Sequence, residues 1–480
     1  MEIRVEKVGG FKFRLPSSQW PRMRTDGIVY ANDSLMSSIK NDNSLLQVMN
    51  VATLPGIVGP SIGMPDIHWG YGFPIGGVAA FDYDEGIVSP GGVGYDINCG
   101  VTLIRSSLTL NDLRPKLKEV VDEIFRLVPS GVGSKGRYSI GHQDLNNILA
   151  EGIDWAVNRG YATEDDREKT EEYGRMEGAD PAHVSSEARN RGIPQIGTLG
   201  AGNHFLEIQV VERVMDPGTA RAFGIEEGKV TVMIHTGSRG LGHQVATDYI
   251  KRLNESSDSV RDVPDRQLTS AFLKSRIAQE YMGAMRAAAN FGFVNRQLIV
   301  NSVREAFRRV MHLPAEDLGL DLVYSLAHNI AKVEEHDVDG KKVKVLVHRK
   351  GATRAFPAGR KENNRKYRET GHPVLIPGDM GRASYVLVGL PGSLSESFGS
   401  SCHGAGRMLS RSKATSTYPA SRVISELEQK GIYLRAASKK VVSEEAPYSY
   451  KDVDEVVASV AGAGISRIVS RHIPVGVVKG

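Results

Sequence analysis

The stretch FLEIQVVERV (residues 205–214), together with KVTVMIH (229–235), decides the fold class. Both are short, largely apolar runs rich in β-branched residues, which is typical of strands. Similar runs are scattered over the whole length, namely IRVEKV, GVAAFDY, VTLIRSSL, KVKVLVH and ASYVLVGL. Their separations never settle into a regular strand–helix–strand repeat. We therefore predict an α+β protein: a single large mixed α/β body with scattered strands.

Helical periodicity is clearest in three places. A mainly helical excursion is predicted near 243–313. The polar stretch 160–195, which precedes it, is predicted to be an exposed insertion. No linker rich in proline or serine separates autonomous units, so residues 1–480 are expected to form one catalytic domain. The three helical segments are LRPKLKEVVDEIFRLV (113–128), QLTSAFLKSRIAQEYMGAMRAAANFG (267–292) with NRQLIVNSVREAFRRVMHL (295–313), and SRVISELEQKG (421–431).

The composition is that of a globular protein, with 40% hydrophobic and 24% charged residues. No apolar run approaches the roughly 20 residues that span a bilayer, and the first residues, MEIRVEKVGGFKFRL, carry charges unlike a signal peptide. Two cysteines among 480 residues fit a reducing compartment. We expect a cytoplasmic location without membrane contact; a disulfide between Cys99 and Cys402 is the alternative to free thiols.

Glycine is over-represented, with 52 residues, and the excess lies in short loops that also carry histidines. The segment GGVGYDINCGV (91–101) places Asp96 three residues before Cys99, so both side chains can turn toward one ion. A thiolate, a carboxylate and imidazoles suit zinc, manganese, iron or cobalt better than calcium. The spacing matches no standard zinc motif, so it does not identify the metal. Histidines in comparable turns are His68, His204, His235, His328 and His403.

Two further patterns indicate anion binding. TGSRGLG after His235 offers backbone N–H groups and Arg239 to a phosphate, and HGAGR (403–407) places a histidine before a glycine loop. That histidine is either part of a structural turn or a nucleophile attacking phosphorus.

Residues 341–368 are rich in Lys and Arg, with a single Glu. This run is either a solvated basic face or a track for a nucleic-acid backbone, with Lys350 and Arg354 as candidate phosphate contacts.

Eight motifs together resemble the RtcB family of RNA-splicing ligases, in the family's order and over essentially the full chain. They are QVMNVATLPGIVGPSIGMPDIHWGYGFPIGG, GGVGYDINCGV, GTLGAGNHFLEIQ, IHTGSRGLGHQV, AHNIA, PGDMGRASY, CHGAGR and the terminal PVGVVKG. The resemblance implies a GTP- and Mn(II)-dependent ligase that joins RNA ending in a 2′,3′-cyclic phosphate or 3′-phosphate to RNA beginning with a 5′-hydroxyl. Expected partners are RNA, with tRNA exon halves foremost, and an archease-type activating protein.

The resemblance also implies roles for individual residues. His403 would be the nucleophile that carries GMP, and two Mn(II) ions would be held by Asp96, Cys99, His204, His235 and His328, with Cys99 shared. Asp379 departs from the small hydroxyl residue usual in the family, and Arg382 follows it as a possible counter-charge. Asp66 and His68 have no role derived from sequence. The implied GTP/GMP pocket comprises Asn203, His204, Phe205, Leu206, Glu207, His328, Asn329, Pro377, Gly378, Asp379, Met380, Ser384, His403, Gly404, Ala405, Gly406, Arg407 and Lys479.

Two other functions compete with ligation. A metal-dependent phosphodiesterase would open the cyclic phosphate with activated water and would not join ends. A non-enzymatic RNA-binding module would use only the basic run and would need no metal.

Overall fold

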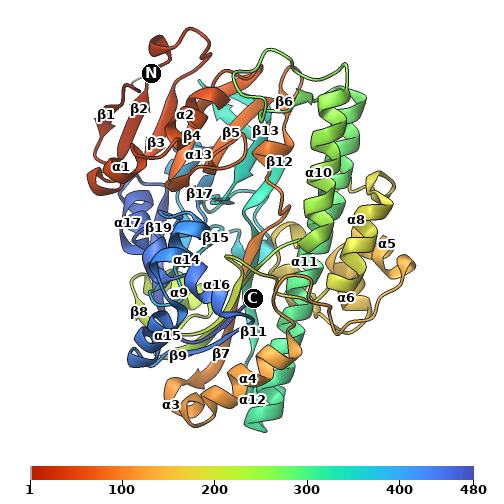
Figure 1. The fold of residues 1–480 in the computed structure, drawn as a ribbon, viewed down its shortest axis with the longest axis vertical. Coiled ribbons are helices and arrows are strands. Elements are labelled where there is room, and N and C mark those ends of the chain that lie inside the picture. Colours follow the sequence, from red (N-terminus) through yellow and green to blue (C-terminus); the bar gives the residue numbers. More distant parts are fainter. Residues whose placement is uncertain (1–2) are drawn as a thin grey trace.

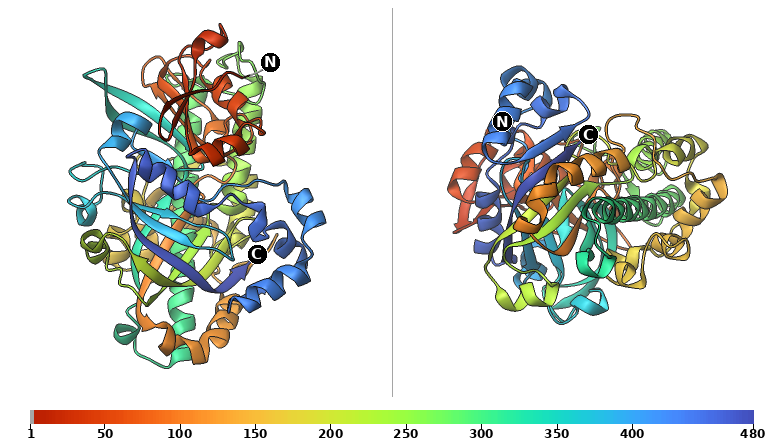
Figure 2. Two further views of the ribbon diagram at one scale, coloured as in Figure 1. Left: turned by 90° about the vertical axis from the view of Figure 1, so that its left-hand side faces the viewer. Right: turned by 90° about the horizontal axis from the view of Figure 1, so that it is seen from below.

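The computed structural model describes residues 3–480, and its larger elements form two β-sheets flanked by helices (Figure 1). The first sheet is built mainly from N-terminal strands and lies above the second in Figure 2. Its seven strands are ordered β1 (Glu6–Gly9), β2 (Lys12–Leu15), β3 (Gly27–Tyr30), β4 (Ile57–His68), β5 (Ile75–Asp82), β13 (Lys341–Lys350) and β12 (Asn329–Val338).

The second sheet has eight strands, and Cys99, His204 and His235 lie at the ends of three of them. The predicted strand 205–214 is confirmed residue for residue as β8, and 229–235 lies within β9. The strand order is β11 (Asp321–Ala327), β7 (Gly100–Thr109), β9 (Lys229–Thr236), β8 (Phe205–Val214), β19 (Ser466–Lys479), β16 (Ser384–Gly389) and β15 (Pro373–Ile376), with β18 (Tyr433–Ala436) paired to β19.

Two short strand pairs and many helices complete the described part of the chain, and the predicted α+β class is confirmed. The short pairs are β10 (Ala271–Phe272) with β6 (Ile87–Val88), and β14 (Ala352–Arg354) with β17 (Ser400–Cys402). The α-helices are α1 (Asp33–Ile39), α2 (Ser44–Val51), α3 (Leu110–Leu113), α4 (Leu117–Leu127), α5 (His142–Glu151), α6 (Ile153–Asn158), α7 (Glu164–Glu168), α8 (Ser186–Gly192), α9 (Pro217–Phe223), α10 (Arg239–Glu255), α11 (Arg276–Met311), α12 (Ala315–Leu318), α13 (Gly392–Ser397), α14 (Arg411–Thr417), α15 (Ala420–Gln429), α16 (Lys439–Glu444) and α17 (Val453–Gly462).

The two helical runs predicted at 267–292 and 295–313 are one helix, α11, which extends over 36 residues beside α10 (Figure 1). It begins later than predicted because Ala271 and Phe272 pair with β6, and because the Ser275 hydroxyl accepts from the Ala278 N–H at 3.4 Å. Such a cap satisfies one of the free N–H groups of the first turn. Across residues 3–480, no helix has the length and apolar character needed to cross a bilayer.

Helix α11 is buried for most of its length, so the helical excursion packs into the body instead of projecting from it. Small residues allow close approach: a Cβ built on Gly292 would lie 3.0 Å from Cβ of Asn98. At Gly283 the same test gives 3.0 Å to Cβ of Asp180. The helix therefore reaches both the loop before β7 and the polar segment 160–195.

The segment 160–195 differs from the exposed insertion that its polarity predicts. It contains exposed residues, but Asp166 and Glu171 are fully buried. Asp166 accepts two hydrogen bonds from the guanidinium of Arg304 on α11, each 2.7 Å, and Glu171 lies 2.7 Å from the ammonium of Lys332. These charges are buried because their partners lie on other elements, which the local composition does not reveal.

Candidate active site

The candidate site lies where the chain passes from one sheet to the other. His328 is the single residue between β11 of the eight-stranded sheet and β12 of the seven-stranded sheet. Cys99 directly precedes β7, His204 directly precedes β8, and His235 is the penultimate residue of β9. Because these neighbouring strands are antiparallel, the four positions meet at one sheet edge.

Asp96, Cys99 and His204 form a first group of possible metal ligands. Nε2 of His204 lies 2.9 Å from Oδ2 of Asp96 and 3.4 Å from Sγ of Cys99. Nδ1 of His204 lies 3.1 Å from the carbonyl oxygen of Leu199. In the tautomer that donates from Nδ1 to this carbonyl oxygen, the lone pair of Nε2 is directed toward Asp96 and Cys99 and can bind a cation.

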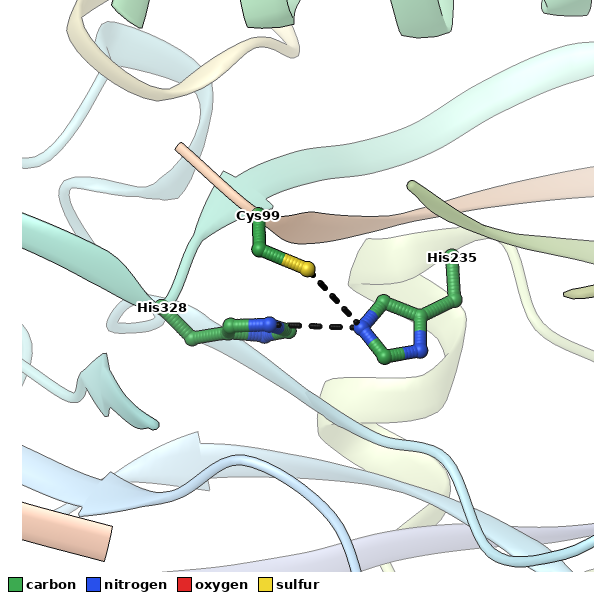
Figure 3. Close-up of side chains that lie close together, drawn as sticks. All are labelled: Cys99, His235 and His328. Carbon is green, nitrogen blue, oxygen red and sulfur yellow. Dashed lines mark hydrogen bonds between the residues drawn. The ribbon is translucent and has the colours of Figure 1, made fainter. Parts of the chain in front are cut away.

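Cys99, His235 and His328 form a second group, so Cys99 belongs to both (Figure 3). Nε2 of His235 lies 3.3 Å from the Cys99 sulfur and 3.3 Å from Nε2 of His328. The His328 N–H donates to the carbonyl of Cys99 at 2.8 Å, which fixes the two residues against each other. Cys99 is common to both groups, and its sharing between two ions stays a prediction.

The chemistry of these groups fits bound cations. Burial lowers the pKa values of His235 and His328 well below the usual histidine value, so both rings are neutral near pH 7. Two imidazole nitrogens and a sulfur, all atoms that bind transition metals, then face one another across 3.3 Å. Both cysteines are free thiols, which excludes the alternative disulfide between Cys99 and Cys402. A soft thiolate with imidazoles and a carboxylate is suited to a divalent transition metal.

Polar residues of α11 hold the loops that carry these ligands. The guanidinium of Arg296 donates to the carbonyl oxygens of Asn98 and Thr236, at 2.8 and 3.0 Å, and to Oδ1 of Asn98 at 2.8 Å. Asn98 itself adopts a positive φ of 53°, an unusual conformation for a residue other than glycine. Asn295 bonds the backbone of Thr198 and Gly237. The long helix therefore fixes the geometry of the ligand loops.

His403, the predicted nucleophile, directly follows β17 and adjoins the second group, since its ring centroid is 4.8 Å from that of His328. Its Nδ1 lies 2.6 Å from Oδ2 of Asp66, a fully buried residue of β4. The backbone N–H groups of His403 and Gly404 donate to the same oxygen at 3.0 and 3.2 Å. Asp66 is thus a functional candidate whose role sequence reasoning missed.

Asp66 is itself supported by Lys451. The Lys451 ammonium donates to the carbonyl oxygens of Pro65, at 3.1 Å, and Ile67, at 2.5 Å, on either side of Asp66. Burial lowers the pKa of Lys451 to about 8. Burial acts against ionisation of Asp66, but its contacts with His403 and the nearby Lys451 ammonium lower the pKa of this carboxyl below its usual value. Asp66 is therefore a carboxylate directed at Nδ1 of His403.

A cavity of about 220 Å³ opens beside His403. Asn203, two residues before β8, and Glu207 within it both face the cavity. It is also lined by five residues to which the sequence assigned no site role: His68, Ile75, Arg411, Glu445 and Tyr450. The predicted pocket residues that line it are Asn203, Phe205, Glu207, Pro377, Gly378, Asp379, Met380, His403, Gly404, Ala405, Gly406, Arg407 and Lys479.

Other predicted pocket residues lie behind the cavity wall. Leu206 points to the opposite side of β8 into an apolar cluster, as alternation requires. The Ser384 hydroxyl accepts from the Gly378 N–H at 3.1 Å and so supports the 377–380 loop. Asn329 bonds the backbone of Asp96 and Gly351. His204 and His328 belong to the ligand groups and not to the cavity lining.

Glu207 and Lys479 lie on adjacent strands, where Lys479 pairs with Phe205. Burial raises the pKa of Glu207 to about 8 and lowers the pKa of Lys479. Lys479 Nζ is 3.7 Å from Oε2 of Glu445, which also pairs with Arg407 at 3.0 Å. The cavity thus holds a protonated carboxyl and several cationic side chains, which suits a ligand with hydrogen-bonding edges and negative charge.

Asp379, the departure from the family pattern, is buried and lies 3.4 Å from Nε of Arg382. Burial raises its pKa to about 6. The counter-charge expected from Arg382 is therefore present, although the contact is a single long ion pair.

The three candidate phosphate contacts are less exposed than their sequence context suggests. Nη1 of Arg239 lies 3.3 Å from Nδ1 of His204, beside the first ligand group. Lys350 donates to the carbonyl oxygens of Tyr71 and Phe73, and burial lowers its pKa to about 7. Arg354 is 2% exposed and lies 2.6 Å from the Glu172 carboxylate. Lys350 and Arg354 are thus buried and occupied within the protein, so the basic run is not a continuous exposed track.

Comparison with known proteins places this site in a family. The family model described as tRNA-splicing ligase RtcB matches residues 47–480. A tRNA-splicing ligase RtcB of Thermococcus kodakarensis is 57% identical over 480 residues, which cover 100% of this chain and 99% of that protein. Those of Archaeoglobus fulgidus and Pyrobaculum aerophilum are 53% and 52% identical, covering 100% of this chain and 100% and 99% of theirs. The motifs, the fold and these relatives agree, and the chain belongs to the tRNA-splicing ligase RtcB family.

Proposed function

We propose that this protein is a GTP- and Mn(II)-dependent RNA ligase that joins a 2′,3′-cyclic phosphate or 3′-phosphate end to a 5′-hydroxyl end. The observation that carries the proposal is the position of His403, between a cavity with several cations and two ligand groups that share Cys99. Because the site draws residues from both sheets, we propose that residues 1–480 act as one catalytic domain. The relatives are named tRNA-splicing ligases, so tRNA exon halves are the proposed substrate.

The ligand groups would hold two Mn(II) ions, which would neutralise charge on the reacting phosphate oxygens. Asp66 keeps Nδ1 of His403 engaged and leaves the lone pair of Nε2 free, so Nε2 is the attacking atom. It would form a bond to the α-phosphorus of GTP as pyrophosphate departs. The 3′-phosphate then takes GMP from His403, and the 5′-hydroxyl displaces GMP to form the phosphodiester. A cyclic end is first opened by water to the 3′-phosphate.

Incubation with α-labelled GTP and Mn(II) tests the first step directly. Wild type should form a labelled adduct that is lost in mild acid and survives alkali, because neutral imidazole leaves far more readily than a lysine amine. His403→Ala should form none, yet keep its metal content and still seal RNA synthesised with GMP on its 3′-phosphate. Cys402→Ser, next to His403, is the matched control and should retain the adduct.

RNA ends test the rest of the proposal. A pair with 3′-phosphate and 5′-hydroxyl ends should be joined, and a pair with 3′-hydroxyl and 5′-phosphate ends should not. Opening of the cyclic phosphate without an adduct or joining would identify a phosphodiesterase instead. An adduct on lysine, or joining of the second pair, contradicts the mechanism. Dependence on an archease-type protein stays a prediction, tested by adding one to a single-turnover reaction.

A further inference from the structure

Three aromatic side chains form a row beside the loop that carries Asp96. Tyr95 stacks on His243, with ring centroids 4.9 Å apart and planes at 25°. Tyr71 meets Tyr95 edge to face, with centroids 5.5 Å apart and planes at 65°. Tyr71 lies between β4 and β5, Tyr95 directly precedes Asp96, and His243 is in the second turn of α10. We call Tyr71, Tyr95 and His243 the aromatic row.

The aromatic row reaches the surface and is held rigidly from behind. His243 is exposed, while Tyr71 and Tyr95 are half-buried. The buried Lys350 ammonium donates to the carbonyl of Tyr71, and the Gly72 N–H donates to the side chain of Gln267 at 3.0 Å. Tyr95 packs against the largest apolar cluster. A surface that is already ordered loses little entropy when a ligand stacks on it.

Charge differs between the two ends of the aromatic row. The guanidinium of the exposed Arg191 donates to Oε1 of Gln244, the residue next to His243, at 2.7 Å. Among residues 3–480, no carboxylate lies within ion-pair distance of Arg191. Asp265 faces Tyr71 at the other end, and Asp96 lies beside His243. An anionic chain is therefore favoured near Arg191, while Asp265 disfavours phosphate near Tyr71.

We infer that the aromatic row binds unpaired RNA bases next to a reacting end, with Arg191 contacting the backbone phosphate; this rests on the proposed function. Bases of any sequence stack on aromatic rings, which suits an enzyme defined by its ends. Tyr95 adjoins Asp96 of the first ligand group, so an end held there brings its neighbouring bases to the row. His243, as the exposed end of the row, would take the first base. Either the 3′-phosphate strand or the 5′-hydroxyl strand could supply it.

The test measures binding of two fluorescent ten-nucleotide RNAs by anisotropy, one with a 3′-phosphate and one with a 5′-hydroxyl reacting end. Stacking contributes about 1–3 kcal/mol per base, so His243→Ala should weaken the binding of one of the two RNAs by about five-fold or more. Tyr95→Leu should weaken the binding of the same RNA. Replacing the two nucleotides nearest the reacting end with abasic residues should weaken RNA binding by wild type to a similar extent. Wild type and His243→Ala should then bind the abasic RNA equally. The affected RNA identifies the strand.

Tyr83→Leu is the matched control, because Tyr83 is half-buried, packs against the same apolar cluster and lies between Lys274 and Lys344. It should leave RNA binding unchanged, and His243→Ala should form the GTP adduct like wild type. Equal binding of intact RNA by wild type, His243→Ala and Tyr95→Leu overturns the inference, as does an equal loss for intact and abasic RNA. If wild type joins RNA in that case, only the row fails; if wild type neither binds nor joins RNA, the proposed function fails with it.

Discussion

The cluster around Cys99 and the cluster around Glu171 are both buried and polar, but only the second contains its own counter-charges. Glu171 and Glu172 face Lys332 and Arg354, with the closest contacts at 2.6 and 2.7 Å. Around Cys99, neutral imidazoles converge on a thiol at 3.3–3.4 Å. A buried polar network in which every charge has a partner stabilises the fold. Nitrogen and sulfur atoms that converge without such partners instead indicate a binding site for a cation. Removing single members should therefore affect stability in one cluster and metal binding in the other.

The largest effect is expected from Cys99→Ala, because Cys99 belongs to both ligand groups. We expect loss of metal measured by elemental analysis, with guanylylation and ligation both reduced to background. Loss of one ligand from a single group, as in His204→Ala, should spare part of the metal content. Full metal occupancy in purified Cys99→Ala would show that Cys99 is not the shared ligand.

Asp66→Asn should slow adduct formation by about 10²-fold or more, because the amide can no longer hold Nδ1 of His403 as a charged acceptor does. Metal content should match wild type, since Asp66 belongs to neither ligand group. Lys451→Met, one contact further away, should produce a smaller loss in the same assay. A normal adduct rate in Asp66→Asn would remove Asp66 from the site.

Arg354→Met should lower the free energy of unfolding by about 3–5 kcal/mol, because Glu171 and Glu172 lose a buried counter-charge. Urea titration measures this change, and RNA affinity of the folded variant should stay that of wild type. Lys361→Met, an exposed position of the same basic run, is the control and should alter stability little. Weaker RNA binding at unchanged stability would instead favour the phosphate contact that composition predicts.

The smallest effect concerns Glu207 in the nucleotide-free protein. Its pKa is raised to about 8, against about 4.3 in an unfolded chain, so between these values only the folded state holds the proton. Stability should then fall as pH rises, by up to about 1.4 kcal/mol between pH 6 and 7. Glu207→Gln should remove this slope in thermal unfolding. A stability difference between the two proteins that is the same at pH 6 and 7 would contradict the raised pKa.

Sequence patterns predicted local features well and distant pairings poorly. The strand over 205–214 follows from a run of apolar and β-branched residues within ten positions. The pairing of His403 with Asp66 could not be predicted from the sequence. Asp66 lies 337 residues earlier, and only the packing of β4 against β17 brings the two residues together. Similarly, the basic run gave no sign that Glu172 would neutralise Arg354 across 182 residues. The family resemblance supplied the ligand set, whereas the geometry supplied the reason for Asp66.

The hydrogen bonds from Arg296 to Asn98 have a consequence for folding during synthesis. The two residues are 198 positions apart, so a chain emerging from its N-terminus completes the Cys99 loop long before α11 exists to hold it. His403 follows only later still. Since domains generally fold as units, we expect the Cys99 loop to gain its contacts with α11 only after Arg276–Met311 have been synthesised. Metal loading would then come after translation, as one of the last steps of maturation.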